Sequence, residues 1–184
     1  MTERVKILEG EKVALALLER EDSLLWYRHM NDLEVQQFLS IGGCLLSKEA
    51  EQEYYDIVTK DPNMRIFAIC VEWEKNIGNI SFQINQKNRN AELGIVIFNK
   101  DYRSQGYWTE SIQLLLKYAF EILGLHKVYL NLVAYNERAG KVYQKVGFKE
   151  IGRRKEHRYF YGKYHDMIEM EIMKCEWEKF CFHQ

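Results

Sequence analysis

The segment Asp101-Tyr-Arg-Ser-Gln-Gly-Tyr-Trp-Thr-Glu110 decides the fold, because it links a predicted strand over 91–98 to a long predicted helix. Apolar residues at three- and four-residue spacing indicate that helix, which Gly124 ends: Ile112, Leu115, Leu116, Ala119, Phe120 and Leu123. A loop that opens a helix presents unpaired backbone N–H groups and the positive end of the helix dipole, and it therefore binds phosphate well. Gly106 would let the backbone approach a phosphate closely, and Arg103 would add a positive charge.

The segments on either side predict an alternation of strands and helices. Toward the N-terminus we expect a strand over 13–18, helices capped by Asp22, by Asn31 or Asp32, and by Ser47, and strands over 65–73 and 77–84. Toward the C-terminus we expect a strand over 128–134, a helix over 137–146 that Asn136 caps and Gly147 ends, and a hairpin of 149–160 with 165–173.

This order predicts an α/β fold with a mixed, largely antiparallel sheet of about seven strands and helices on both faces. A helix connects the strands over 91–98 and 128–134, so these two should run parallel and splay apart where a phosphate loop lies. The chain has one proline, and we find no repeat or linker in it. We therefore expect a single domain over residues 1–184, with its core at about 12–173.

Composition excludes several classes of protein. The 184 residues are 47% hydrophobic, which is enough for a sizeable core. Lys and Arg number 26 against 27 Asp and Glu, so charge gives no case for nucleic acid or an anionic membrane as partner. No apolar run is long enough to span a membrane, no secretory signal is visible, and the four cysteines lack zinc-ligand spacing. We expect a cytoplasmic protein with reduced thiols and no metal.

Two motifs resemble those of the GNAT acyltransferase superfamily. The segment Arg103-Ser-Gln-Gly-Tyr-Trp108 is similar to the family's pyrophosphate loop, Arg/Gln-x-x-Gly-x-Gly/Ala, although Trp108 stands where the family has a small residue. The segment from Asn136 to Phe148 looks like the family's N-x-x-A-x-x-x-Y-x-x-x-G-F. Residues 17–35 and 158–172 resemble the RimJ/RimL-like branch, and bacterial spermidine acetyltransferases look similar over the same stretch.

The resemblance implies acetyl-CoA as co-substrate and assigns roles to the matching residues. The diphosphate would bind the backbone of the loop residues Arg103, Ser104, Gln105, Gly106, Tyr107, Trp108 and Thr109. The pantetheine arm would pair like an added strand along Ile95, Val96 and Ile97 and contact Asn136. The other expected cofactor-binding residues are Ala139, Gly140 and Tyr143. In the family the tyrosine that matches Tyr143 protonates the leaving thiolate, and in the histone-acetylating branch a Glu at the spacing of Glu92 is the general base.

Each assignment has a structural alternative. Tyr143 would then be a rim aromatic, Glu92 a solvated charge at a strand end, and Asn136 only a helix cap. Four acidic residues on the third predicted helix suggest a wall for a cationic substrate, although a solvated helix face explains them as well: Glu49, Glu51, Glu53 and Asp56. We interpret the basic run 153–158 as a solvated face of the hairpin and all five histidines as structural.

These observations predict an N-acetyltransferase that moves the acetyl group of acetyl-CoA to a primary amine by direct attack, with no acyl-enzyme. The amine would be a protein N-terminus or a small molecule, and a polyamine such as spermidine or spermine is the alternative acceptor. A non-catalytic CoA-binding regulatory module is the alternative from another class. We expect no nucleic acid or membrane partner and consider a homodimer.

Overall fold

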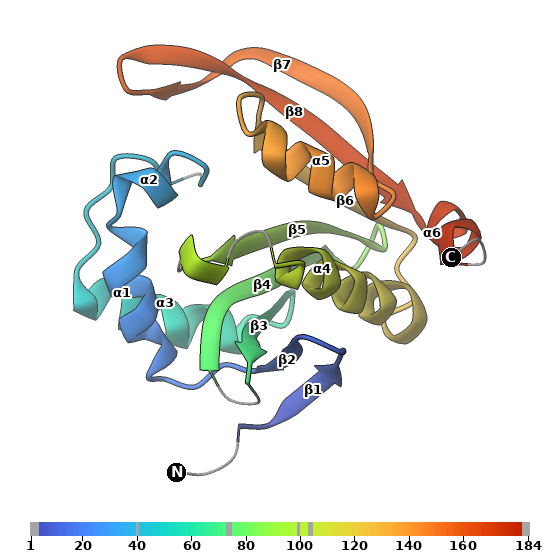
Figure 1. The fold of residues 1–184 in the computed structure, drawn as a ribbon, viewed down its shortest axis with the longest axis horizontal. Coiled ribbons are helices and arrows are strands. Elements are labelled where there is room, and N and C mark those ends of the chain that lie inside the picture. Colours follow the sequence, from blue (N-terminus) through green and yellow to red (C-terminus); the bar gives the residue numbers. More distant parts are fainter. Residues whose placement is uncertain (1–3, 40, 73–74, 99, 103–104, 182–184) are drawn as a thin grey trace.

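One mixed sheet of eight strands forms the centre of the molecule, in the order β1-β2-β3-β4-β5-β6-β8-β7 (Figure 1). The computed structural model describes residues 4–39, 41–72, 75–98, 100–102 and 105–181. The strands are β1 (Lys6–Glu9), β2 (Ala14–Leu17), β3 (Met64–Val71), β4 (Lys75–Asn85), β5 (Asn90–Ile97), β6 (Lys127–Val133), β7 (Lys149–Phe160) and β8 (Lys163–Met173). All neighbours pair antiparallel except β5 and β6.

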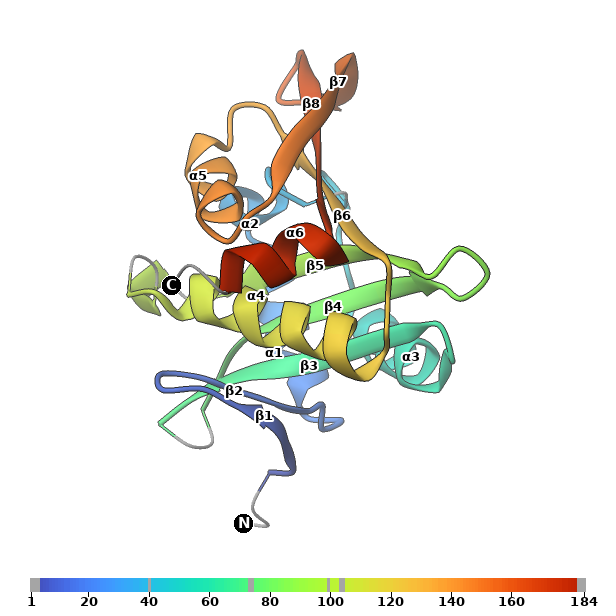
Figure 2. The ribbon, with the colours of Figure 1, turned by 90° about the vertical axis from the view of Figure 1, so that its right-hand side faces the viewer.

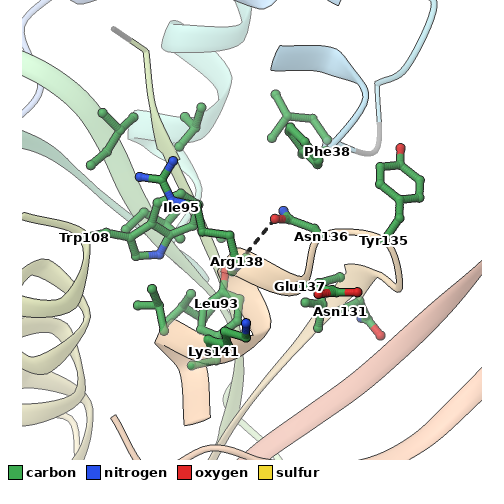
Figure 3. A pocket seen from close by; sticks show the side chains of 18 of the residues that line it. Phe38, Leu93, Ile95, Trp108, Asn131, Tyr135, Asn136, Glu137, Arg138 and Lys141 are labelled. Atoms are coloured by element: carbon green, nitrogen blue, oxygen red, sulfur yellow. Dashed lines mark hydrogen bonds between the residues drawn. The ribbon is translucent and has the colours of Figure 1, made fainter. Parts of the chain in front are cut away.

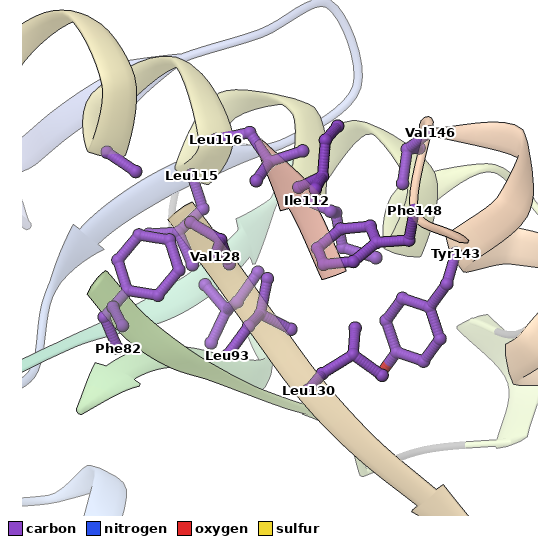
Figure 4. Close-up of a cluster of buried hydrophobic side chains, with 14 of the residues drawn as sticks. Phe82, Leu93, Ile112, Leu115, Leu116, Val128, Leu130, Tyr143, Val146 and Phe148 are labelled. Atoms are coloured by element: carbon purple, nitrogen blue, oxygen red, sulfur yellow. The ribbon is translucent and has the colours of Figure 1, made fainter. Parts of the chain in front are cut away.

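Helices cover both faces of the sheet, as predicted (Figure 2). On one face α1 (Asp22–Met30), α2 (Leu33–Gln36) and α3 (Lys48–Lys60) bury Trp26, Val35 and Val58 against Val96 and Phe98. On the other face lie α4 (Tyr107–Lys117), its π-helical continuation η2 (Tyr118–Ile122) and α6 (Lys174–Cys181). The predicted apolar stripe of α4 enters the larger core, which also holds side chains of α5 (Glu137–Lys145) (Figure 4).

Local sequence explains where most helices begin and end. The side chains of Asp32, Ser47 and Asn136 accept hydrogen bonds from Glu34 N, Ala50 N and Ala139 N, at 2.8, 3.1 and 3.2 Å. These three caps confirm the prediction. Gly124 and Gly147 have φ of +60° and +99°, the left-handed conformation that a helix end favours.

The predicted cap at Asp22 is wrong. Asp22 is the first residue of α1 and is buried, and its carboxylate serves a longer-range network. It accepts hydrogen bonds from the Arg4 guanidinium at 2.7 and 3.0 Å, from Asn76 Nδ2 at 2.8 Å and from Glu19 N at 2.8 Å. Asp22 therefore ties the N-terminal segment, the start of α1 and the start of β4 together, which a helix-capping pattern cannot reveal.

The prediction of about seven strands missed β1. This strand has four residues, lies at the edge of the sheet and alternates between exposed and half-buried positions. A short edge strand of this kind carries little of the apolar alternation by which a strand is found in sequence.

We predict that Asp22→Ala strongly destabilises the fold. The Arg4 side chain is only 10% exposed, so removing Asp22 leaves a buried charge whose remaining carboxylate partner, Glu19, is 43% exposed. Loss of one partner of such a pair costs about 3–5 kcal/mol. The measurement is the free energy of unfolding in urea.

The matched control is Asp56→Ala, which removes the carboxylate of an exposed ion pair with Arg20. Solvent screens that pair, so the urea midpoint should stay close to wild type. Equal effects of the two substitutions would show that the Asp22 network does not hold these elements together.

Candidate active site

The opening between β5 and β6 creates the site. The two strands pair parallel, as predicted, over three positions only: Asn90↔Lys127, Ala91↔Val128 and Glu92↔Tyr129. Beyond them β5 stays paired with β4 as far as Ile97, and β6 stays paired with β8 as far as Val133. In the described part of the chain, no strand pairs with the β6-facing edge of β5 after Glu92.

A cavity of about 1280 Å³ occupies this opening (Figure 3). Ten of the residues predicted for the site line it: Glu92, Ile95, Val96, Ile97, Gly106, Trp108, Thr109, Asn136, Ala139 and Tyr143. Gln105, Tyr107 and Gly140 are not part of its lining, and Arg103 and Ser104 lie outside the described residues. Contacts of these five residues with a ligand stay predictions.

The loop before α4 has the geometry of an anion site. Gly106 occupies the N-cap position with φ +87°, and no side chain caps the helix among the described residues. The first N–H groups of α4 therefore lie at one end of the cavity, beside Trp108 and Thr109 in its wall.

Lys12 brings a positive charge to the same loop, and no local sequence pattern predicts this contact. The Glu110 carboxylate of α4 accepts hydrogen bonds from Lys12 N at 3.1 Å and from Glu11 N, so the β1–β2 turn is fixed on α4. Lys12 Nζ then lies 3.5 Å from the Gln105 carbonyl oxygen, and 3.3 Å from where a Cβ on Gly106 would stand. A cation in this place suits a diphosphate.

Tyr143 reaches the cavity from α5 and is 7% exposed (Figure 4). Its ring makes edge contacts with Trp108 and Phe148, at centroid distances of 6.4 and 5.7 Å. Trp108, the departure from the family's loop pattern, thus forms a wall beside Tyr143. Burial raises the pKa of Tyr143 well above its ordinary value, so its hydroxyl stays a neutral proton donor.

Glu92 enters the cavity from the other face of the sheet. Its neighbour Leu93 packs in the same core as Tyr143, and side chains alternate along a strand, so Glu92 and Tyr143 approach from opposite faces. Glu92 Oε1 accepts a hydrogen bond of 2.9 Å from Asn131 Nδ2. Its Oε2 has no hydrogen-bond partner among the described residues.

The end of the cavity away from α4 is closed by a contact between distant segments. Tyr135, beyond the end of β6, donates from its hydroxyl to the Gln37 carbonyl at 2.6 Å and packs on Phe38 at 5.9 Å between centroids. Arg158 of β7 donates to the Gln36 carbonyl at 2.8 Å. The α2 region is therefore held against the β7–β8 hairpin, and both contribute to the lining.

The interpretation of 153–158 as a solvated face is wrong for Arg154 and Arg158, which are half-buried, while the other four residues are exposed. Arg154, His157 and Arg158 line the cavity, and burial lowers the pKa of Arg158. The β7 ladder is irregular between Arg154 and Arg158, so their orientation does not follow from strict alternation. The acidic residues of α3 give no wall: Glu49 and Glu53 are exposed, Glu51 is buried, Asp56 pairs with Arg20, and none lines the cavity.

The described ranges contain neither a metal-binding cluster nor a membrane-spanning helix. No three His, Cys, Asp or Glu side chains come close enough to hold a metal ion, and no described helix is long and apolar enough to cross a membrane. The described thiols of Cys44, Cys70 and Cys175 are free.

Comparison with known families gives the context for this geometry. The sequence model of an acetyltransferase (GNAT) domain matches residues 12–149, which is most of the chain. The chain belongs to the GNAT acetyltransferases. This confirms the resemblance seen in its two motifs, the fold class, and the predicted enzyme class, an N-acetyltransferase that uses acetyl-CoA.

Several relatives among the GNAT acetyltransferases are similar along the chain. Spermidine N(1)-acetyltransferase of Escherichia coli (strain K12) is 30% identical over 166 residues, which cover 90% of this chain and 88% of the relative. "Putative ribosomal N-acetyltransferase YdaF" of Bacillus subtilis (strain 168) is 35% identical over 95 residues, about half of either protein. The crystal structure of the Vibrio cholerae spermidine N-acetyltransferase with CoA and spermine has a TM-score of 0.85 and 27% identity, and covers 92% of this chain and 99% of that one.

The cavity of this GNAT domain fits the co-substrate of its family. The β5 edge past Glu92 is free to pair with an extended chain such as pantetheine. The α4 N-terminus and Lys12 suit the diphosphate. Trp108 Nε1 is buried and has no hydrogen-bond partner in the described part of the chain, so it offers a donor in the cavity wall.

We predict that Gly106→Val lowers the affinity for CoA at least about tenfold. A β-branched side chain at φ +87° is strained, and its Cβ would stand 3.3 Å from Lys12 Nζ, where we expect the diphosphate to bind. Isothermal titration calorimetry with CoA gives the measurement.

The control is Gly162→Val in the β7–β8 turn, which also has positive φ, +73°, but open space around the added Cβ. It should introduce similar backbone strain and leave CoA affinity unchanged. If Gly106→Val binds CoA as tightly as this control, the loop is not the diphosphate site.

Proposed function

We propose that this acetyltransferase acetylates a primary amine by direct attack, with Glu92 as general base and Tyr143 as general acid. One observation carries the proposal: the two side chains enter the same cavity from opposite faces of the sheet, at the split between β5 and β6. An amine and a thioester that meet in the split would have a base on one side and a proton donor on the other. A single domain over 1–184, a cytoplasmic location and a homodimer stay predictions from the sequence.

The proton balance of the reaction assigns one transfer to each side chain. Glu92 takes a proton from the attacking amine, directly or through water, as the C–N bond forms. Tyr143 supplies a proton to the sulfur as the C–S bond breaks. Glu92 then releases its proton to water and Tyr143 regains one, so both return to their starting states.

The β5 backbone would complete the site. A backbone N–H within residues 95–97 on the open edge would donate to the thioester oxygen as negative charge develops there. Among the described residues that line the cavity there is no cysteine or serine, which supports direct attack rather than an acyl-enzyme.

The charge of the lining favours acceptors with few positive charges. Three of the five lysine and arginine side chains in the lining, Arg138, Lys141 and Lys145, belong to α5, at the end proposed for the co-substrate. The two at the acceptor end are Arg154 and Arg158 of β7, and no Asp or Glu of α2 or of the β7–β8 hairpin lines the cavity in the described part of the chain. A peptide N-terminus or a small monoamine would meet less repulsion there than a polyamine. Polyamine acetylation is the second candidate, because the Escherichia coli and Vibrio cholerae relatives are named spermidine acetyltransferases.

A panel of amines tests the acceptor. We expect thiol release from acetyl-CoA with peptide N-termini and monoamines, at higher kcat/KM than with spermidine or spermine, because of the basic lining. The measurement is thiol release at fixed acetyl-CoA. Preference for spermidine would establish the second candidate, and release no faster than without amine across the panel would favour the non-catalytic module.

We predict that Tyr143→Phe lowers kcat by about 10²–10⁴-fold and leaves CoA affinity near wild type, because it removes only the proton donor. Burial raises the pKa of Tyr143, so in the wild type its deprotonation should produce no fall in kcat below about pH 10. The measurements are kcat against pH under conditions where chemistry limits turnover, and calorimetry with CoA.

Tyr164→Phe is the matched control, because Tyr164 is an exposed tyrosine of β8 outside the cavity. It should behave as wild type. Full kcat in Tyr143→Phe would remove Tyr143 from the mechanism, while the cofactor assignment would stand.

A further inference from the structure

A row of polar side chains crosses four strands beside the split. Glu92 and Tyr129 are paired in register, and Asn131 lies two residues further along β6, so Glu92 and Asn131 project from the same face of the sheet. Asn131 is in turn paired with Glu169 of β8. Arg154 of β7 is paired with Met167, which lies two residues from Glu169 along β8 and so on the same face. The strands diverge between Glu92 and Asn131, yet the two side chains meet across the opening at 2.9 Å.

Arg154 determines which way the Asn131 amide faces. Its Nη2 donates to Asn131 Oδ1 at 2.7 Å, and a guanidinium has no acceptor, so the amide oxygen must face Arg154. The amide nitrogen is then directed at Glu92, where it donates to Oε1. Two further contacts hold Arg154: its Nε lies 2.9 Å from Glu169 Oε1, and its Nη1 lies 2.9 Å from His157 Nε2.

We infer that Asn131 is a positioning residue for the acetyl transfer, and that Arg154 orients it. The inference rests on the proposed function, in which Glu92 is the base. Asn131 binds one carboxylate oxygen of Glu92, a residue of the cavity lining, which restricts rotation of the group and leaves Oε2 without a hydrogen-bond partner among the described residues. A carboxylate held in one rotamer is already oriented to take the amine proton, so no conformational entropy is lost at that step.

Asn131→Asp separates this role from packing. The substitution keeps the shape of the side chain and gives Arg154 a stronger partner, but it replaces the donor to Glu92 by a negatively charged oxygen. We expect kcat to fall about ten- to hundredfold while the KM for acetyl-CoA stays unchanged. A residue that only packed or held Arg154 would tolerate the change.

The same substitution in a Glu92→Gln background tests whether Asn131 acts through Glu92. Glu92→Gln alone should lower kcat, because an amide cannot take the proton. In the double variant, the amide nitrogen introduced by Glu92→Gln can donate to the carboxylate introduced by Asn131→Asp. The kcat of the double variant should therefore be no lower than that of Glu92→Gln alone. If the fold-loss of kcat in the double variant equals the product of the losses in the two single variants, Asn131 acts independently of Glu92, and the inference is overturned.

Gln83→Ala is the control, because Gln83 is an exposed amide of β4 opposite Glu92 in register, outside the cavity lining. It should keep wild-type kcat. Thermal melting and CoA calorimetry confirm that each variant folds and binds.

Full activity of Glu92→Gln would overturn the base assignment itself. A slow Glu92→Gln beside a fully active Asn131→Asp would overturn the positioning role alone.

Discussion

The structure depends on one limited interaction, the pairing of β5 with β6 over three residues. If the two strands paired along their full length, the edge of β5 would be saturated and the cavity would close. If they did not pair, the sheet would divide between β5 and β6, because this is the one strand pairing that joins its two halves in the described order. The short parallel ladder thus keeps one continuous sheet and still leaves backbone groups of β5 free for a ligand.

The parts of this design that come from local sequence could be predicted. The α4 stripe, the Gly106 loop and the Asn136 cap each depend on neighbours a few residues away, so spacing alone indicates them. The roles implied for Tyr143 and Glu92 came from the family resemblance, and the structure brings both residues to one cavity.

The parts that could not be predicted depend on register between distant segments. Lys12 reaches the Gly106 loop only because Glu110 holds the β1–β2 turn. Asn131 faces Glu92 because of the offset between β5 and β6, which no single strand encodes. Arg158 joins the lining through an irregular ladder and a contact with α2. Sequence reasoning treats such residues as surface, since their partners are not adjacent in the chain.

The two ends of the cavity are built from different parts of the chain. One end consists of β5, α4 and α5, while the other consists of the α2 region, Tyr135 beyond β6 and the β7–β8 hairpin. If the co-substrate binds at the α4 end, as proposed, substitutions in α2 or the hairpin leave its binding residues unchanged. A lineage with this architecture can change its acceptor by drift at one end alone, so divergence in substrate does not require a new fold or a new catalytic centre.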